Sequence, residues 1–480
     1  MLRQLILIIG SITAIIAMPG CYRDKGNYEY SDINKITITS AITSYSVMIP
    51  DSLKIDVTIT QTLPAAEGLS FQWVLFPNTA APLTRRTIGT TQNLRAALTE
   101  DPGSYLLDFF VKDNKTGVEI QKRFNVTILT ALSEGWVVVE EKGGSCDLSM
   151  ITPTDVIFRD VYSQINGGQH LPIGTFRIPE IKVNRNIQSV YIMSPSDMIF
   201  TNFANFLKVS EFNSFFFQVP NPPQPQEYFM NSDEETLLNN GKPYSRNLNG
   251  VGTIKLSLPP VGNYYMAPFE LYSIITSYMW YDTIGQRFWR QDPNNFSLFG
   301  FAADPSDPFD MNNIGKRIIY AETNTSNTYF AIFKNNNDDS LFAYNFKVGG
   351  TGRSPVAVYA GLVAPGLMTA KKFVMSKTLP FLYYVNGNII YKLDIPAKTA
   401  APIYTFPAGT EIKAMKMYLN RKTSDPNNNK LIAVATVEGG NQGKVYYFPI
   451  AATGNFTGDT YSKVFTGFGK INEITFKSLK

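Results

Sequence analysis

Side chains that commonly carry catalysis or bind metals are scarce in this chain of 480 residues. It contains one histidine, His170, and two cysteines, Cys21 and Cys146. A histidine-based zinc site needs more imidazole ligands than this, and a Ser-His-Asp or Cys-His device would depend entirely on His170. His170 follows an Asn-Gly-Gly-Gln run that predicts a loop. These counts argue against the common hydrolase and metalloenzyme chemistries.

Acidic residues are adjacent at residues 140–141, 233–235 and 338–339. A glycosidase needs two carboxylates about 5–10 Å apart across a cleft, and adjacency along the chain does not predict that arrangement. Asp338 and Asp339 follow three asparagines, which predicts a hairpin tip, with an oxygen-rich calcium loop as the alternative. There is no phosphate-binding glycine loop, nucleotide fingerprint or nucleophile elbow. We therefore predict no catalytic residue, no metal site and no cofactor.

The first thirty residues predict export and a lipid anchor. Arg3 gives a positive start, and an apolar run of 14 residues extends from Leu5 to Met18. This run is shorter than the roughly 18 residues that span a bilayer, and its layout is typical of an export signal. Pro19-Gly20 directly before Cys21 resembles a bacterial lipobox, which implies a diacylglycerol and palmitate lipid on Cys21. The alternative is an ordinary secretory signal that happens to contain a cysteine.

With Cys21 lipidated, Cys146 has no partner for an intrachain disulfide. We expect its thiol to be reduced and buried. The segments on either side of Cys21 are then a signal peptide at residues 1–20 and a polar tether at residues 21–34.

Aromatic residues in the middle of the chain are the candidates for ligand binding. They are Tyr264, Tyr265, Trp280, Tyr281 and Trp289. Exposed aromatic faces stack on sugar rings and grip peptide side chains. The alternative is that these residues fill the space between neighbouring sheets.

The composition is typical of an all-β protein. Aromatic residues make up 13% of the chain, charged residues only 17%, and asparagine and glycine are frequent. The net charge of +4 is spread without a lysine or arginine block, so nucleic acid is not predicted as a partner. No second apolar segment is long enough to span a membrane, so we expect any anchoring to depend on the lipid.

Residues 35–130 carry short alternating runs separated by turn residues. The runs are residues 36–39, 53–60, 71–76, 105–111 and 124–128. Alternation with period two at this spacing predicts a β-sandwich. Trp73 is in the middle of one run, where sandwich cores place a large aromatic side chain.

Residues 131–480 show an internal repeat of β-hairpins. Clear hairpins start near Tyr278, Tyr329, Phe381 and Lys430, about 50 residues apart, and weaker ones occur at residues 135–140, 189–200 and 228–244. A period of 40–50 residues with several strands per unit predicts a β-propeller. The six intervals from Trp136 to the last hairpin average about 49 residues, which predicts seven blades.

The two ends of the repeat region predict how the ring closes. Residues 411–417 form the strand that precedes the last hairpin, and residues 470–477 resemble it but are followed by no hairpin. The hairpin at Trp136 lacks such a preceding strand. We predict that these two ends pair in one blade and remove the exposed sheet edges. The expected fold is all-β: an immunoglobulin/PKD-like sandwich followed by a seven-bladed propeller.

Several segments resemble the PKD-like family of bacterial lipoproteins. The run from Asp101-Pro102-Gly103 through Tyr105 to Asp113 is similar to the closing strands of PKD (polycystic-kidney-disease-type) domains, although the usual glycine-aspartate turn after the tryptophan strand is replaced by Phe76-Pro77-Asn78. The lipobox, residues 24–28 (DKGNY) and residues 134–141 (EGWVVVEE) complete the resemblance. It implies an accessory lipoprotein of a Gram-negative nutrient-uptake locus, encoded beside a TonB-dependent transporter and its substrate-binding lipoprotein.

The resemblance also implies an outer-membrane location, with the chain displayed at the cell surface. Surface-displayed lipoproteins of such bacteria usually carry acidic residues just after the cysteine, whereas residues 22–25 (YRDK) are mixed in charge. The family offers no catalytic motif to carry over.

The expected function is that of a non-enzymatic, lipid-anchored binding protein. Its propeller would capture a glycan or peptide or dock on the transporter. The alternative is a propeller-type glycoside hydrolase or lyase, which close carboxylate pairs at the central channel would favour. A third reading is a structural assembly subunit, which a large, flat apolar patch would favour.

Overall fold

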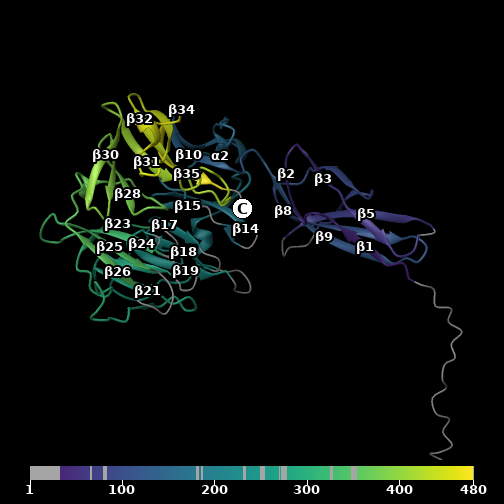
Figure 1. Cartoon of the computed structure of the whole chain (residues 1–480), viewed down its shortest axis with the longest axis horizontal. Coiled ribbons are helices and arrows are strands. Elements are labelled where there is room, and N and C mark those ends of the chain that lie inside the picture. The colour runs from purple at the N-terminus through teal and green to yellow at the C-terminus, as the bar shows by residue number, and fades with distance from the viewer. Residues whose placement is uncertain are drawn as a thin grey trace, which may run out of the picture.

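The computed structural model describes residues 33–64, 67–78, 84–179, 183–184, 187–230, 234–248, 255–269, 271, 278–324, 328–347 and 354–478. Figure 1 shows two bodies of β-strands, formed by the N-terminal and the C-terminal part of the chain. The predicted all-β class is confirmed. Cys21 and most of the predicted tether lie outside the described residues.

The N-terminal body is a β-sandwich. One layer is the five-stranded sheet β2 (Ser44–Met48), β9 (Glu119–Leu129), β8 (Gly103–Asp113), β5 (Leu69–Pro77) and β6 (Arg86–Gly89), in that order. The other layer consists of two pairs, β1 (Ile36–Thr39) with β4 (Thr58–Gln61) and β3 (Ser52–Ile55) with β7 (Leu94–Ala97). The buried side chains of both layers form one hydrophobic cluster.

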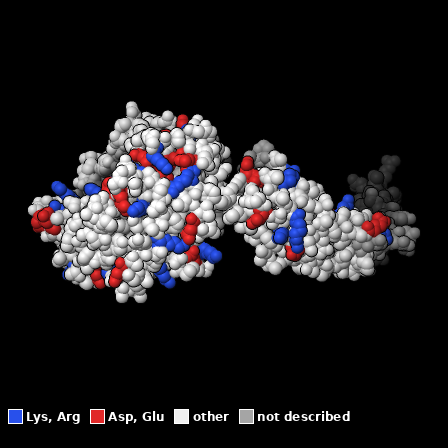
Figure 2. Space-filling view, turned by 90° about the horizontal axis from the view of Figure 1, so that it is seen from above, with Lys and Arg blue, Asp and Glu red and all other residues white. Residues whose placement is uncertain are grey.

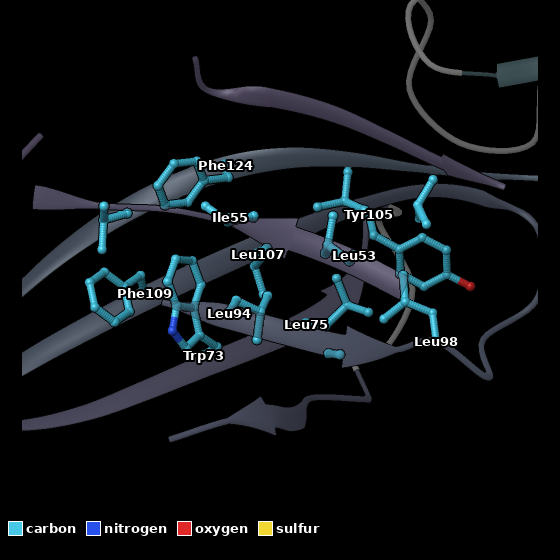
Figure 3. Close-up of a cluster of buried hydrophobic side chains, with 14 of the residues drawn as sticks. Leu53, Ile55, Trp73, Leu75, Leu94, Leu98, Tyr105, Leu107, Phe109 and Phe124 are labelled. Carbon is cyan, nitrogen blue, oxygen red and sulfur yellow. The ribbon is translucent and has the colours of Figure 1, made fainter. Parts of the chain in front are cut away.

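Trp73 lies at the centre of this cluster, as its position in the sequence predicts. It is fully buried, and its ring stacks on Phe109 at a centroid distance of 4.0 Å and contacts Phe124 at 5.6 Å (Figure 3). The indole N–H donates to the carbonyl of Thr91 at 2.8 Å, so the polar edge of this large side chain is satisfied.

The predicted single strand at residues 53–60 is divided in the structure. β3 pairs with β7, whereas β4 pairs with β1. Between them, the buried Val57 uses its N–H to bind Oδ1 of Asn93 at 3.1 Å instead of a strand partner. The alternation continues through this break, so the pattern alone does not reveal the change of partner.

The PKD-like residues fix the two ends of β8. The Tyr105 hydroxyl donates to the carbonyl of Asp101 at 2.7 Å. At the other end, the carboxylate of Asp113 accepts the N–H of Lys115 at 3.0 Å and the amide of Asn34 at 3.1 Å. The motif therefore holds both turns of the strand and attaches residue 34 to the turn that follows β8.

The described residues of the C-terminal body form seven sheets, which we call blades 1 to 7. Blade 1 is β35 (Lys470–Lys477), β10 (Gly135–Lys142), β11 (Ser145–Ile151) and β12 (Ile157–Phe158); blade 2 is β13 (Val183–Asn184), β14 (Ile187–Ser194), β15 (Asp197–Asn202) and β16 (Lys208–Glu211). Blade 3 is β17 (Pro225–Met230), β18 (Glu234–Asn239) and β19 (Lys242–Asn247); blade 4 is β20 (Met279–Asp282), β21 (Arg287–Gln291) and β22 (Leu298–Phe299). Blade 5 is β23 (Arg317–Thr323), β24 (Thr328–Lys334), β25 (Leu341–Lys347) and β26 (Pro355–Ala360). Blade 6 is β27 (Phe373–Met375), β28 (Phe381–Asn386), β29 (Ile389–Asp394) and β30 (Thr399–Thr405); blade 7 is β31 (Glu411–Met417), β32 (Leu431–Glu438), β33 (Gln442–Pro449) and β34 (Lys463–Phe468).

Short helices lie in some of the connections. They are α2 (Val161–Ile165), η1 (Phe212–Phe215), η2 (Leu367–Thr369) and η3 (Thr457–Asp459).

Each blade packs on the next through a hydrophobic cluster of its own. Among the described residues there are seven such clusters, one for every pair of neighbouring blades. The seventh joins blade 7 to blade 1 and includes Trp136, Ala433 and Ile474. In Figure 1 the sheets surround a common centre, with β31, β35, β17 and β23 nearest to it and β34, β30 and β26 at the periphery. The blades therefore form a closed ring.

The predicted pairing of the two ends of the repeat region is confirmed. β10 pairs antiparallel with β35, from Gly135 opposite Lys477 to Glu141 opposite Lys470. The EGWVVVEE segment also binds the incoming chain through its acidic residues. Glu140 accepts the N–H of Gly469, and Glu141 accepts the side-chain amide of Asn472 at 2.8 Å. Two acidic residues of the EGWVVVEE segment therefore help to hold β35, the last strand of the chain, in place.

The link between the two bodies is fastened to the propeller. Thr130 donates to the carbonyl of Ala204 at 2.8 Å, and Lys477 Nζ donates to the carbonyl of Leu132. Two residues further, Glu134 accepts the amide of Asn420 at 3.0 Å. These contacts fix three successive points of the connection, so it is not a free hinge.

Lys477 is fully buried at this junction, with Nζ 4.2 Å from the Phe203 ring centroid and 4.6 Å from that of Phe206. Burial lowers the pKa of Lys477 well below its ordinary value, so the unfolded chain binds one more proton than the folded chain between that lowered pKa and about 10.5. Folding stability should therefore rise with pH across this window, by up to about 1.4 kcal/mol per pH unit.

Lys477→Met removes the group that takes up this additional proton when the chain unfolds. Urea unfolding of both proteins between pH 7 and 9.5 should show wild-type stability rising relative to the variant. Parallel pH profiles would mean that Lys477 remains charged in the folded protein.

Candidate functional site

Innermost strands from around the ring bring six charged residues to the propeller axis. We call Arg177, Glu227, Glu322, Lys377, Lys416 and Glu473 the axial cluster. Glu473 lies on β35, Glu227 on β17, Glu322 on β23 and Lys416 on β31, the innermost strands of their blades. Lys377 follows β27, and Arg177 pairs with Met193 of β14 on the side occupied by β13. Side chains from blades on opposite sides of a ring can meet only at its axis.

Arg177 joins two of the carboxylates. Its guanidinium forms an ion pair with Glu227 from blade 3 and a second one, at 3.5 Å, with Glu473 from blade 1. Lys416 from blade 7 approaches the same oxygen of Glu473 at 3.6 Å. Four blades are thus connected through a single chain of charges.

Glu322 is the centre of the other half of the cluster. It binds Lys377 as an ion pair, accepts the hydroxyl of Tyr320 at 2.5 Å and accepts the N–H of Met375 at 2.7 Å. The Tyr320 ring stacks on Phe373 from blade 6 at 4.7 Å and meets the ring of Phe269 edge-on at 5.5 Å. Phe269 precedes β20, so blade 4 also reaches this region.

The cluster is deep in the molecule yet accessible to water. Side-chain exposure is 30% for Arg177 and 26% for Lys416, but 8% for Glu227 and Glu473. Burial lowers the pKa of Lys416, and the nearby charge of Arg177 adds to this effect. Burial also opposes the charge of Arg177, but Glu227 and Glu473 outweigh it, so the pKa of Arg177 lies above its ordinary value.

The arrangement favours binding over acid–base chemistry. Glu227 and Glu473 converge on the axis, as a glycosidase would require, but both face the guanidinium of Arg177. A general acid needs a carboxyl that stays protonated near neutral pH, whereas a neighbouring cation stabilises the ionised form. Three carboxylates and three cations also leave the cluster without net charge.

Three of the five aromatic candidates are not exposed. Tyr264, Trp280 and Tyr281 are buried, and all three belong to hydrophobic clusters between blades. The Trp280 N–H donates to Gln291 at 2.7 Å, and the Tyr281 hydroxyl donates to the carbonyl of Lys316. The expectation of exposed faces is wrong for these three residues, because each blade must bury both of its sides against its neighbours.

The other two candidates, Tyr265 and Trp289, are partly buried. The Tyr265 hydroxyl accepts the amide of Gln226 at 2.8 Å, and its ring occupies the space where a side chain at Gly241 would lie. Arg287 covers the Trp289 ring at 3.7 Å. Both aromatics therefore contribute to packing around blades 3 and 4, and the structure does not bring the five together at one open face.

The remaining candidates have structural partners. Cys146 is a free, fully buried cysteine, as predicted, and burial raises its pKa to about 12. His170 lies in the connection after α2, where Nδ1 is 3.0 Å from Oδ2 of Asp147. Asp338 is in the turn between β24 and β25 and accepts the N–H of Ser340 at 2.8 Å, which confirms the hairpin tip.

No local pattern in the sequence predicts the axial cluster. Its members belong to no recognisable motif, as with Lys416 between two methionines and Glu473 before Ile474. One signal of the cluster is present in the sequence. The strands predicted at residues 411–417 and 470–477 are equivalent in the repeat, and each carries a charged residue in its interior. Which charges meet depends on ring closure, which places residues up to 296 positions apart within 3.5 Å.

The described part of the chain shows no group of three or more histidine, cysteine, aspartate or glutamate residues arranged to hold a metal ion. Within the same ranges, no helix has both the length and the apolarity needed to cross a membrane. On the face in Figure 2, basic and acidic residues are interspersed rather than gathered into a field of one sign.

The fold and the axial cluster define a class of protein: a β-sandwich joined to a seven-bladed propeller with a polar, electrically balanced axis. A model of the PKD-like family matches residues 21–171. This match includes Cys21, the sandwich and the first hairpin of blade 1. No curated protein matches the sequence.

Solved structures show similarity in fold. A quinonprotein alcohol dehydrogenase-like protein from Bacteroides thetaiotaomicron aligns over 90% of this chain and 96% of its own, with 13% identity and a TM-score of 0.39. A functionally unknown protein from Desulfotomaculum acetoxidans aligns over 72% and 100%, with 13% identity and a TM-score of 0.39. The WD40 domain of SCAP from fission yeast aligns over 61% and 74%, with 10% identity and a TM-score of 0.35. Identities this low concern the fold alone.

Proposed function

We propose that this protein is a lipid-anchored, non-enzymatic binding protein of a nutrient-uptake system at the outer membrane. Lipid on Cys21 holds the chain at the membrane. The propeller captures a glycan or peptide or docks on a TonB-dependent transporter. The substrate-binding lipoprotein of that transporter is a further partner.

The observation that carries this proposal is where the two connections leave the sandwich. Residue 34 is bound to Asp113 at the turn between β8 and β9, whereas the propeller begins just beyond Leu129, at the other end of β9. β9 has 11 residues, so these two points are separated by about 33 Å at a rise of about 3.3 Å per residue. The sandwich therefore separates residue 34 from the start of the propeller and can act as a spacer (Figure 1).

The enzyme alternative has one specific observation in its favour. Burial raises the pKa of Glu134, and the charge of Asp425 acts in the same direction. The amide of Asn420 lies between the two, 3.0 Å from Glu134 and 3.4 Å from Asp425. A carboxyl with a raised pKa beside a second carboxylate is the arrangement of a general acid in glycoside hydrolysis. Release of reducing ends from a polysaccharide by the wild-type protein, lost in Glu134→Gln, would support this alternative.

Membrane fractionation tests the anchor. Wild-type protein should incorporate labelled palmitate and sediment with outer membranes, because a triacylated cysteine supplies more than one buried chain. Cys21→Ala should lose all of the label and leave the membrane fraction, whereas Cys146→Ala should behave as wild type. Equal membrane association of Cys21→Ala and wild type would contradict the lipid anchor.

Two further measurements test the binding role. A soluble chain that begins at Tyr22 should bind members of a glycan or peptide array, and the lipidated protein should co-purify with a transporter from outer membranes. If neither occurs, the proposed function is wrong.

A further inference from the structure

The ammonium groups of the two lysines in the axial cluster differ in how many polar contacts they make with the protein. Lys377 Nζ pairs with Glu322 and donates to the carbonyl of Thr323 at 2.8 Å, and its side chain is 11% exposed. The Lys416 side chain is 26% exposed, and the one ion pair of its ammonium among the described residues is the 3.6 Å approach to Glu473. An ammonium group carries three N–H donors. Lys416 therefore keeps donors that the described part of the chain does not use.

Glu473 offers a matching acceptor beside this donor. Its Oε1 accepts the N–H of Ile474 at 2.9 Å, while Oε2 has only the long contacts to Arg177 at 3.5 Å and Lys416 at 3.6 Å. A hydroxyl group both donates and accepts. One hydroxyl placed against Lys416 and Glu473 can accept a hydrogen bond from the ammonium and donate one to the carboxylate.

The charge balance of the cluster indicates the net charge of the ligand. A strongly anionic ligand would face Glu227, Glu322 and Glu473, and a cationic ligand would face the three basic residues. A neutral ligand with several hydroxyls meets neither penalty and can use donors and acceptors together. Tyr320, Phe373 and Phe269 lie next to Glu322 and are partly buried. The part of these rings that remains exposed is apolar surface that a sugar ring can contact.

We propose that the axial cluster is a binding site for a neutral carbohydrate, in which Lys416 and Glu473 together bind a sugar hydroxyl. This inference rests on the proposed binding function and assigns it a site and a ligand class. It places recognition on the axis of the ring rather than on the aromatic residues between blades 3 and 4.

Lys416→Met tests the site. Methionine keeps the length and apolar stem of the side chain but removes the ammonium, which makes no hydrogen bond to the residues that the structure describes, so the fold should be retained. Lys413→Met is the matched control, because Lys413 lies on the same strand and pairs with Glu411. Thermal unfolding and circular dichroism should show that both variants fold as wild type does.

The probes are an array of neutral and acidic glycans, a peptide array and free amino acids, followed by calorimetry with the oligosaccharides that bind. We expect wild type and Lys413→Met to bind neutral oligosaccharides with affinities within twofold of each other. Lys416→Met should bind them at least tenfold more weakly. Acetylation of Lys416 by acetic anhydride, mapped by mass spectrometry, should slow when a bound oligosaccharide is present.

The outcomes separate this inference from the proposed function. Neutral glycans that bind wild type and Lys416→Met equally would overturn the axial site and leave the binding function standing. Binding of acidic glycans, peptides or amino acids alone would overturn the ligand class. If nothing binds, both the inference and the capture role fall, and transporter docking alone remains.

Discussion

Removing β35 by ending the chain at Gly469 is expected to abolish the cooperative unfolding of the propeller. The deletion takes away Ile471 and Ile474, which are fully buried between blades 7 and 1, and each is worth about 1.5–3 kcal/mol of burial. It also leaves the whole inner edge of β10 without its partner and uncovers Trp136. The combined loss is comparable with the roughly 5–15 kcal/mol that stabilises a typical domain.

Near-ultraviolet circular dichroism and urea unfolding measure this effect. The truncated chain should lose the tertiary signal and the sharp transition of the full chain, and it should bind a hydrophobic dye. A chain that lacks only residues 479–480 is the control. An unchanged unfolding midpoint after loss of β35 would show that ring closure contributes little to stability.

A point substitution tests the contribution of ring closure to stability without shortening the chain. A side chain at Gly469 would bring its Cβ to 2.3 Å from the carbonyl oxygen of Glu141, so Gly469→Ala should cost about 1–3 kcal/mol through overpacking. Gly439 has no atom within 4 Å of the corresponding position. Gly439→Ala should therefore change stability by less than about 0.5 kcal/mol.

Much of this architecture could be predicted from the sequence because it follows from local patterns. The hairpins near Tyr278, Tyr329, Phe381 and Lys430 occur as β20–β21, β24–β25, β28–β29 and β32–β33. Their spacing predicts seven blades. The strand at residues 470–477, which no hairpin follows, is predicted to pair with the hairpin at Trp136, which lacks a preceding strand. These signals are turn residues, alternation and period, which the chain carries without reference to distant contacts.

The site could not be predicted in the same way. A tyrosine or tryptophan on a strand has the same local pattern whether it faces solvent or a neighbouring blade, so Trp280 and Tyr281 gave no sign of their burial. The axial charges have the opposite property: Arg177 and Glu473 are remote in sequence and meet only when the ring is closed. Geometry at the axis is a consequence of the whole fold and has no local signature.

Replacing Arg177 with methionine is the second change with a large expected effect. It leaves Glu227 without its ion-pair partner and leaves Glu473 with only the distant Lys416. Both carboxylates are 8% exposed, and removing one partner of a buried pair typically costs about 3–5 kcal/mol. We expect the free energy of unfolding at pH 8 to fall by about this amount.

The pH dependence of Arg177→Met identifies the cause. Without the guanidinium, two buried carboxylates lose the positive charge that faces them, and protonation removes a buried charge that has no partner. The loss of stability in the variant should therefore be smaller at lower pH. Urea unfolding at pH 8 and pH 5.5 should show the gap from wild type narrowing at the lower pH.

A second substitution tests whether the loss comes from unpaired charge. In Arg177→Met alone, Glu227 has lost its ion-pair partner. Adding Glu227→Gln removes this unpaired carboxylate, while Glu473 keeps Lys416 nearby. The double variant should recover most of the lost stability and show a weaker pH dependence than Arg177→Met alone. A double variant as unstable as the single one at both pH values would mean that Arg177 stabilises the axis by packing rather than by charge.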